Sequence, residues 1–284
     1  MKALFDQAES ILGVTLDPSR YLLVGNARWK RSVFLYEPGN AEPSVVAKMP
    51  ANEVAQQQCD REYSSLKRFA QYDIQDVIAP RAAGEMIFEG FRCYFQHVII
   101  SHQWLGKILL SPRGPQRRSF LAAAAYLTRV YQSTRHPKAE NGKSYARCFQ
   151  HGDFWIGNLG QKGSSLVLYD FEYARDDGFP LFDLLQFALY FKVALNNIGK
   201  VGTEIAKGSY DRKREKREFV PSIEDVAMMF VDPGPFRDTV AASIQCYCEG
   251  CGTSREDAAT LLKEYIEQDR GISGLTPGWE HNVL

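Results

Sequence analysis

The sequence predicts an α+β protein with a β-rich N-terminal lobe and a mainly helical C-terminal lobe. Short runs rich in β-branched and aromatic residues, separated by turn residues, dominate the first hundred positions. Longer apolar patterns of helical period dominate the remainder. The chain has 284 residues, about twice the length of an average domain. Its hydrophobic content of 45% excludes global disorder. We expect the two lobes over residues 1–100 and 101–284.

The N-terminal lobe is expected to combine strands with two helices. A short helix over 4–12 comes first, and strands follow over 21–25, 32–36, 44–49, 82–88 and 91–100. A polar and basic tip, residues 26–31, joins the first two strands, and Glu89-Gly90 is the predicted turn between the last two. Asn52 is a candidate N-cap for a helix over 53–70. One helix therefore follows the third strand.

The C-terminal lobe is expected to be built from helices over 120–131 and 182–194 and from two or three more over 222–270. Residues 232–235 and 251–254, rich in Pro and Gly, are the predicted breaks between these last helices. Residues 151–172 are expected to mix loop and short strands. The hydrophilic stretch 199–221 contains the basic run 212–217, which predicts a solvent-exposed loop or helix face.

Charge and hydropathy exclude several classes of protein. Lys and Arg total 34, as do Asp and Glu, so the chain lacks the basic excess of a dedicated nucleic-acid binder. The N-terminus carries acids where a secretory signal needs an apolar run. The longest nearly apolar stretch, 182–195, is shorter than the roughly 20 residues that span a membrane. We expect a cytoplasmic protein with no membrane span, no nucleic-acid partner and six reduced cysteines.

The segment 151–172 carries the candidate chemistry. It contains His151-Gly152-Asp153, then Asn158 five residues after Asp153, then an apolar strand that ends at Asp170. Transfer of a γ-phosphoryl group needs metal ions on the phosphate oxygens and a carboxylate beside the acceptor hydroxyl. Mg²⁺ prefers oxygen ligands of the kind that Asp170 and Asn158 supply. The pattern therefore indicates magnesium-dependent phosphoryl transfer.

These residues resemble the catalytic segment of the aminoglycoside phosphotransferase and choline kinase family, whose members share the bilobal protein-kinase-like fold. The resemblance covers about residues 20–195 and is tightest over 151–172. It implies that Asp153 is the catalytic base and that Asn158 and Asp170 are magnesium ligands. It also implies that Asp183, in the Pro-to-Asp element that follows, braces the catalytic loop, and we expect His151 to be a buried scaffold residue.

The same resemblance implies a site for ATP or GTP in the N-terminal lobe. Lys48 on the third strand would hold the α- and β-phosphates, and Glu62 on the next helix would pair with Lys48, although Glu53 and Asp60 precede the same turns. Protein kinases cover the phosphates with a glycine-rich hairpin. Here that hairpin has only Gly25, followed by the cationic residues Arg28, Lys30 and Arg31. Either these side chains bind phosphate oxygens in place of backbone amides, or the tip is an ordinary exposed turn.

The acceptor is expected to be a small molecule with a hydroxyl group. Only nine residues separate Asp170 from Pro180, too few for the activation segment on which protein kinases dock peptides. Residues 219–284 carry eleven acidic and four basic residues, which favours a cationic acceptor such as an aminoglycoside or an amino alcohol, or marks solvated helix faces. The segment 151–158 also resembles the corresponding loop of fructosamine kinases, which have a tryptophan at the position of Trp155. This resemblance suggests an acceptor with sugar-like hydroxyl groups.

Two other classes of protein stay open. The glycine-poor hairpin is compatible with a catalytically inactive kinase-like module that binds a nucleotide or a partner. A kinase acting on proteins is the third alternative, and the short segment after Asp170 argues against it.

Overall fold

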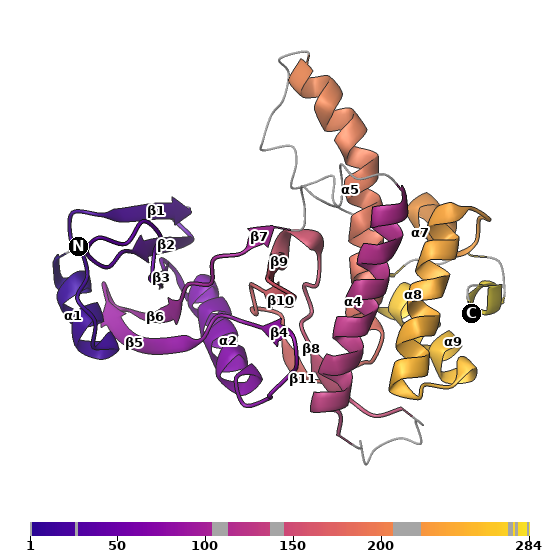
Figure 1. The fold of residues 1–284 in the computed structure, drawn as a ribbon, viewed down its shortest axis with the longest axis horizontal. Helices are drawn as coiled ribbons and strands as arrows, with labels where there is room; N and C mark the ends of the chain where they lie inside the picture. Colours follow the sequence, from indigo (N-terminus) through magenta and orange to yellow (C-terminus); the bar gives the residue numbers. More distant parts are fainter. Residues whose placement is uncertain are drawn as a thin grey trace. The chain divides into compact units, whose positions relative to one another are not determined.

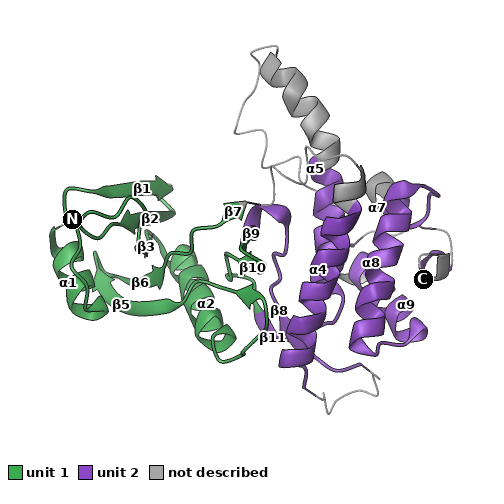
Figure 2. Cartoon of the chain, viewed as in Figure 1, with its two compact units in different colours: residues 1–102, 160–174 green, residues 103–159, 175–284 purple. Residues whose placement is uncertain are grey.

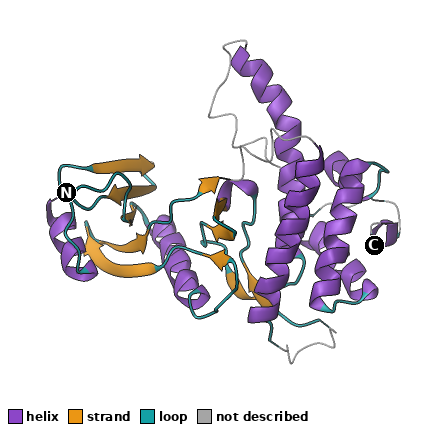
Figure 3. Ribbon diagram, viewed as in Figure 1, coloured by secondary structure: helices purple, strands orange, loops and turns teal. Residues whose placement is uncertain are grey.

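The computed structural model describes residues 2–25, 28–103, 113–136, 145–206, 223–271, 275, 278–282 and 284. The chain forms two compact units (Figure 2). The first contains residues 1–102 and 160–174, and the second contains residues 103–159 and 175–284. Strands predominate in the first unit and helices in the second (Figure 3). The predicted basic run 212–217 lies outside the described residues.

The first unit is built on a five-stranded antiparallel sheet in the order β1-β2-β3-β6-β5 (Figure 1). Its elements are α1 (Lys2–Leu12), β1 (Tyr21–Gly25), β2 (Lys30–Leu35), β3 (Val45–Pro50), α2 (Glu53–Phe69), β5 (Ala82–Phe88) and β6 (Phe91–His97). The β5–β6 turn is formed by Glu89 and Gly90, both with positive φ, 51° and 83°, as a type I′ hairpin turn requires. The predicted strands and both helices are present.

Alternation along the strands divides the sheet into two faces. Val33, Leu35, Ala47 and Phe95 are buried on one face, where α1 contributes Leu4, Phe5 and Ala8 to the same core. The opposite face carries α2, because Tyr63 of that helix stacks on Tyr94 of β6 with ring centroids 4.4 Å apart. In the register of β2 and β3, Ser32 lies opposite Lys48, so Lys48 projects from the α2 face.

A second, four-stranded sheet has the order β4-β10-β9-β7. Its strands are β4 (Val77–Ile78), β7 (His102–Gln103), β9 (Leu159–Lys162) and β10 (Ser165–Leu168). β10 pairs in parallel with β4, which follows α2 in the chain. This pairing places the strand that leads to Asp170 beside the segment that leaves α2.

The second unit is mainly helical. It contains α4 (Arg113–Thr134), β8 (Cys148–Gln150), the 3₁₀ turn η1 (Ile156–Asn158), β11 (Arg175–Gly178), α5 (Phe182–Ala206), α7 (Ile223–Phe230), α8 (Pro235–Cys251), α9 (Arg255–Lys263), the π-helical turn η2 (Glu264–Asp269) and η3 (Trp279–Asn282). α4 packs against α5 and α8 (Figure 1). Phe120 of α4 lies at the centre of this core, with its ring 5.0 Å from those of Phe187 and Phe191.

The structure corrects several predicted boundaries. Lys30 and Arg31 belong to strand β2 and not to the hairpin tip. α4 begins at Arg113 and α5 continues to Ala206, so both helices are longer than their apolar patterns. The antiparallel pair of β8 and β11 was not predicted. The breaks between α7, α8 and α9 fall where Pro and Gly predicted them. Among the described residues, no helix is both long enough and apolar enough to cross a bilayer.

Candidate active site

The loop that contains Asp153 is anchored in the core of the second unit by its apolar residues. Phe154 is fully buried, with its ring 5.9 Å from that of Phe187 on α5, and Ile156 is 1% exposed. Asp153 and Trp155 alternate with these two residues and remain half-exposed. The side chains of Phe154 and Ile156 therefore fix the loop, and Asp153 between them and His151 stays partly exposed to solvent.

Asp183 holds the backbone that precedes Asp153. Its Oδ2 accepts a hydrogen bond from the amide of His151 at 2.7 Å, and its Oδ1 accepts one from the amide of Gly152 at 2.9 Å. Burial raises the pKa of Asp183 to about 6, although these two hydrogen bonds act in the opposite direction. The buried His151 accepts a hydrogen bond from the amide of Asp153 at its Nδ1. Asp183 and His151 thus have the bracing and scaffold roles expected of them.

Asn158 lies against Asp153. Its Nδ2 donates to Asp153 Oδ2 at 2.7 Å and to the Asp153 carbonyl oxygen at 3.1 Å. The 3₁₀ turn η1 produces this arrangement, because it brings residue 158 back toward residue 153. Since the amide nitrogen of Asn158 is bound to Asp153, its amide oxygen is the atom that is suited to bind a cation.

In the first unit, Lys48 and Glu62 form an ion pair between β3 and α2. Glu62 is 2% exposed, so the lysine compensates a buried carboxylate. Asp60, the competing acid on the same helix, is bound to the hydroxyl of Tyr94 and to the side chain of Gln56. Glu53, the other competing acid, is exposed, so Glu62 is the acid of α2 that pairs with Lys48.

Asp170 follows β10, and its two neighbours in the chain are both fixed by contacts. Tyr169 donates its hydroxyl hydrogen to the carbonyl oxygen of Ile99 at 2.8 Å, and the fully buried Phe171 packs edge-on against Phe69 of α2. Asp170 itself has a left-handed φ of 64°. Its Oδ1 is buried and has no hydrogen-bond partner among the described residues.

The unpaired Oδ1 of Asp170 allows us to judge whether a cation fits beside this residue. A buried carboxylate oxygen without a donor is costly unless something positive occupies the space beside it. A carboxylate oxygen at Asp170 and an amide oxygen at Asn158 are ligand types that Mg²⁺ accepts. The residues present therefore fit the predicted magnesium. Asp170 belongs to the first unit, with Lys48, Glu62 and Gly25, whereas Asp153 and Asn158 belong to the second.

Sequence reasoning missed the pairing of Lys30 with Glu172. Lys30 Nζ lies 3.1 Å from Glu172 Oε2, and the two side chains are 19% and 14% exposed. Burial by itself would lower the pKa of Lys30, but the carboxylates of Glu62, Asp170 and Glu172 outweigh it and the pKa is raised. The alternation of β2 was a signal only for the face on which Lys30 lies, the same as that of Ser32, and not for its partner Glu172.

Gly25 shapes the same hairpin. Its φ is 114°, and a β-carbon at this position would lie 2.4 Å from the carbonyl oxygen of Lys30. Only glycine fits so close to that oxygen. Its predicted role in nucleotide binding stays a prediction, while its observed role is to let β1 and β2 approach at their tip.

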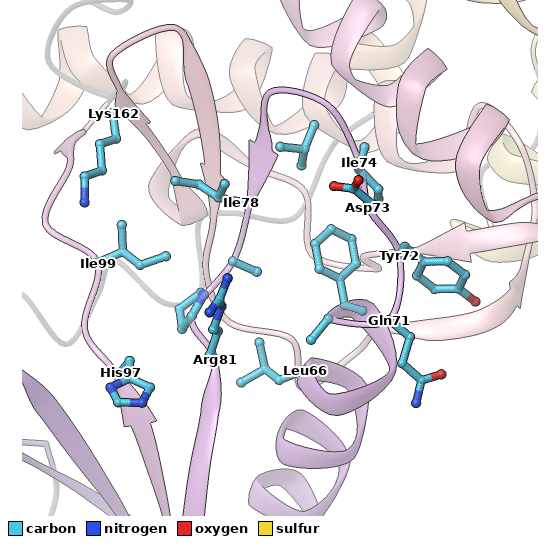
Figure 4. A pocket seen from close by; sticks show the side chains of 15 residues that line it. Leu66, Gln71, Tyr72, Asp73, Ile74, Ile78, Arg81, His97, Ile99 and Lys162 are labelled. Atoms are coloured by element: carbon cyan, nitrogen blue, oxygen red, sulfur yellow. The ribbon is translucent and has the colours of Figure 1, made fainter. Parts of the chain in front are cut away.

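A cavity of about 490 Å³ lies elsewhere in the first unit, beyond the C-terminal end of α2. Its lining includes the apolar residues Leu66, Ile74 and Ile78 and the basic residues Arg81 and Lys162 (Figure 4). None of the predicted site residues lines this cavity. It is therefore separate from the charged residues around Lys48.

Comparison with known proteins identifies the fold. No protein-family model matches the chain, and no curated protein sequence matches it. Among solved structures, amicoumacin kinase hAmiN in complex with AMP-PNP, Ca²⁺ and Ami is similar, with a TM-score of 0.50 and 12% identity over 100% of this chain and 97% of that chain. At this identity the similarity shows a shared fold. It confirms the prediction of an α+β protein-kinase-like fold.

Two further structures align over most of their length with lower scores. A thermostable mutant of aminoglycoside phosphotransferase APH(4)-Ia, in ternary complex with ADP and hygromycin B, has a TM-score of 0.47 and 9% identity over 88% of this chain and 96% of that chain. Macrolide 2′-phosphotransferase MphH from Brachybacterium faecium has a TM-score of 0.40 and 12% identity over 95% of each chain.

Proposed function

We propose that this chain is a phosphotransferase that moves the γ-phosphoryl group of ATP or GTP to a hydroxyl group of a small molecule. The ion pair of Lys48 with Glu62 is the observation that carries the proposal. In protein kinases a lysine on the third strand and a glutamate on the following helix must pair before the phosphates are held correctly. Here the same pair joins β3 to α2, and the carboxylate of Glu62 is almost completely shielded from solvent.

The face of the sheet that carries Lys48 also suits a purine ring. In the strand registers, Leu22 lies opposite Phe34, which lies opposite Val46, and all three point to the same face as Lys48. Leu22 is 51% exposed and Phe34 is half-buried. Val46, beside Lys48, is buried, so the apolar row becomes exposed away from the lysine. An apolar row on the same face as a lysine matches a nucleotide, which has a flat apolar ring at one end and phosphates at the other.

Asp170 and Asn158 would hold magnesium. When bound, the ion neutralises charge on the β- and γ-phosphate oxygens. The buried and unpaired Oδ1 of Asp170 supports its role as the main ligand. Asn158 would contribute its amide oxygen, and its nitrogen would keep the side chain of Asp153 in place.

Asp153 would be the base that accepts the proton of the acceptor hydroxyl. Asp153 is half-buried beside the fully buried Phe154, and its backbone is fixed through Asp183 and His151. Such fixed placement is what a general base requires, since geometry comes before pKa. The nine residues between Asp170 and Pro180 favour a small acceptor over a peptide. Sugar-like and cationic acceptors, including aminoglycosides and amino alcohols, are the classes we expect.

The acceptor class can be found by a thermal-shift screen of metabolites and antibiotics with magnesium and a non-hydrolysable nucleotide present, because a ligand of the folded state raises the melting temperature. Transfer is then measured with γ-labelled ATP or GTP. We expect Asp153→Asn to lower turnover by roughly 10²–10⁴-fold and Asp170→Asn to abolish magnesium-dependent turnover. Asp177→Asn, which changes an exposed carboxylate nearby, is the matched control. Normal turnover in Asp170→Asn would refute the proposal.

The second candidate function is a nucleotide-binding module without transfer. The ion pair of Lys30 with Glu172 favours this alternative, because the lysine of the glycine-poor hairpin is already bound to a carboxylate. This alternative predicts nucleotide binding without label transfer to any acceptor and without slow magnesium-dependent hydrolysis. Label that appeared in proteins of a lysate, and not in metabolites, would instead indicate a protein kinase.

A further inference from the structure

We propose that Lys30 is a phosphate-binding side chain that Glu172 holds until a nucleoside triphosphate displaces it. The inference rests on the nucleotide site proposed above and adds to it a residue that takes the place of a glycine-rich loop. It is carried by the position of Lys30 on the sheet, by the charges around it and by the anchoring of the hairpin tip.

Lys30 lies on the same face of the sheet as the proposed phosphate ligand Lys48. Ser32 is opposite Lys48, and Lys30 is opposite Pro50, so the two lysines are one alternating step apart on adjacent strands. Lys30 is the one nearer the hairpin tip. A lysine is a compact cation with three donors on a flexible stem and is a common phosphate ligand.

The residues around Lys30 carry an excess of negative charge. Two lysines, at 30 and 48, face three carboxylates, at 62, 170 and 172, which gives a formal net charge of −1. Within the described part of the chain, Oδ1 of Asp170 and Oε2 of Glu62 are buried without a hydrogen-bond partner. A magnesium–triphosphate brings a cation for Asp170 and phosphate oxygens for Lys30. Lys30 then exchanges Glu172 for a phosphate and stays paired, whereas Glu172, whose side chain is 14% exposed, gives up its cation.

The backbone of residues 28–30 is anchored by contacts, so the side chain of Lys30 is the part that can move. Asn52 Nδ2 donates to the carbonyl oxygen of Arg28 at 2.9 Å, and the amide of Ala51 donates to the carbonyl oxygen of Trp29 at 2.7 Å. Gly25 packs against the carbonyl oxygen of Lys30 from the other strand. The first residue of β2 thus offers a cationic side chain at a defined place, where a glycine-rich loop offers backbone amides.

The test compares the binding of ATP and of adenosine, which lacks the phosphates, to the full chain by calorimetry. We expect Lys30→Met to weaken ATP binding by about 10–100-fold and to leave adenosine binding unchanged. Arg31→Met is the matched control. Arg31 is the next residue of β2, points to the opposite face and pairs with Glu89 at 2.8 Å, so its loss leaves ATP binding unchanged. Equal losses for ATP and adenosine in Lys30→Met would overturn the inference.

Glu172→Gln tests the displacement, and as a single variant it keeps Lys30 and does not depend on the folding of Lys30→Met. Without magnesium, we expect this variant to bind ATP about 2–5-fold more tightly, because Lys30 is released in advance. The gain should disappear in the double variant Lys30→Met/Glu172→Gln. A gain that persists there would mean that Glu172 acts by its charge alone, which contradicts the proposal.

The outcomes separate this inference from the proposed function. If the unaltered chain binds ATP no better than adenosine, the proposed nucleotide site is wrong. If the unaltered chain prefers ATP and Lys30→Met keeps that preference, only the role of Lys30 is wrong.

Discussion

Asn52 donates a hydrogen bond from its side-chain nitrogen to the carbonyl oxygen of Arg28, at 2.9 Å, while its side-chain oxygen accepts one from the amide of Ala55, also at 2.9 Å. One amide group therefore caps the first turn of α2 and anchors the tip of the β1–β2 hairpin. Because α2 carries Glu62 and the hairpin carries Lys30, Asn52 fixes the position of Lys30 relative to Glu62.

Substitution of Asn52 can separate its two hydrogen bonds. Asn52→Asp keeps the oxygen that caps α2 but loses the donor to Arg28, so we expect near-normal stability and ATP binding weakened about 2–10-fold. Asn52→Ala loses both bonds and should also cost about 1 kcal/mol of stability. Calorimetry and urea unfolding measure the two effects. Asn40→Asp adds the same charge at an exposed turn and should change neither; equal ATP binding by Asn52→Asp and the unaltered chain would contradict the anchoring role.

The pair of Lys48 and Glu62 predicts strong coupling in a double-mutant cycle. Lys48→Met leaves the buried carboxylate of Glu62 without a cation, which should cost about 3–5 kcal/mol of stability. Glu62→Gln in the same chain removes that charge and should recover much of the loss. Urea unfolding of the single and double variants measures the coupling. Additive effects would mean that the two side chains do not depend on each other.

Gly25 in β1 and Gly39 in the turn between β2 and β3 differ in one respect that a substitution can test. Gly25 and Gly39 both have positive φ, 114° and 79°, but only a β-carbon at Gly25 would meet another atom, the carbonyl oxygen of Lys30. Gly39→Ala should cost about 1 kcal/mol, the penalty for a left-handed conformation. Gly25→Ala should cost roughly 1–3 kcal/mol and also weaken ATP binding, since the hairpin tip must shift. Unchanged ATP binding in Gly25→Ala would disconnect this residue from the nucleotide site.

The buried carboxyl group of Asp183 predicts a dependence of stability on pH. Its pKa in the folded chain is about 6, above the ordinary value of 3.8, so the folded state holds the proton more tightly than the unfolded state. This contribution to stability is fully present below pH 3.8 and is lost as the pH rises through 6. It amounts to roughly 3 kcal/mol.

Asp183→Asn removes the titrating group and provides the measurement. Between pH 4 and pH 7, the free energy of unfolding of the unaltered chain should fall relative to that of the variant. Parallel curves would show that Asp183 titrates normally. Label transfer should decline in the same variant at every pH, because an amide cannot accept hydrogen bonds from both His151 and Gly152 through two oxygens.

The sequence was sufficient where local patterns decide the structure. Alternation and turn residues predicted the strands of the first sheet, and the cap at Asn52 predicted the start of α2. The spacing of Asp153 and Asn158 predicted residues of one loop, and in the structure they contact each other. The roles assigned to these residues, to Lys48, Glu62 and Gly25, and to Asp170 stay predictions.

Features that depend on distant partners could not be predicted. Lys30 and Glu172 are 142 positions apart, and neither belongs to a motif that indicates the other. β11 has the polar sequence Arg-Asp-Asp-Gly and is a strand because it pairs with β8. α5 continues through Gly199, a residue of low helix propensity, at which a sequence-based prediction ends the helix.

The pairing of β8 with β11 has a consequence for control of the proposed reaction. β8 leads directly into His151, and β11 lies within the short stretch between Asp170 and Asp183. Part of the chain that joins these acids is thus paired in a β-ladder with β8. For the proposed enzyme we therefore expect no covalent on-switch in this stretch and an output that follows the concentrations of the two substrates.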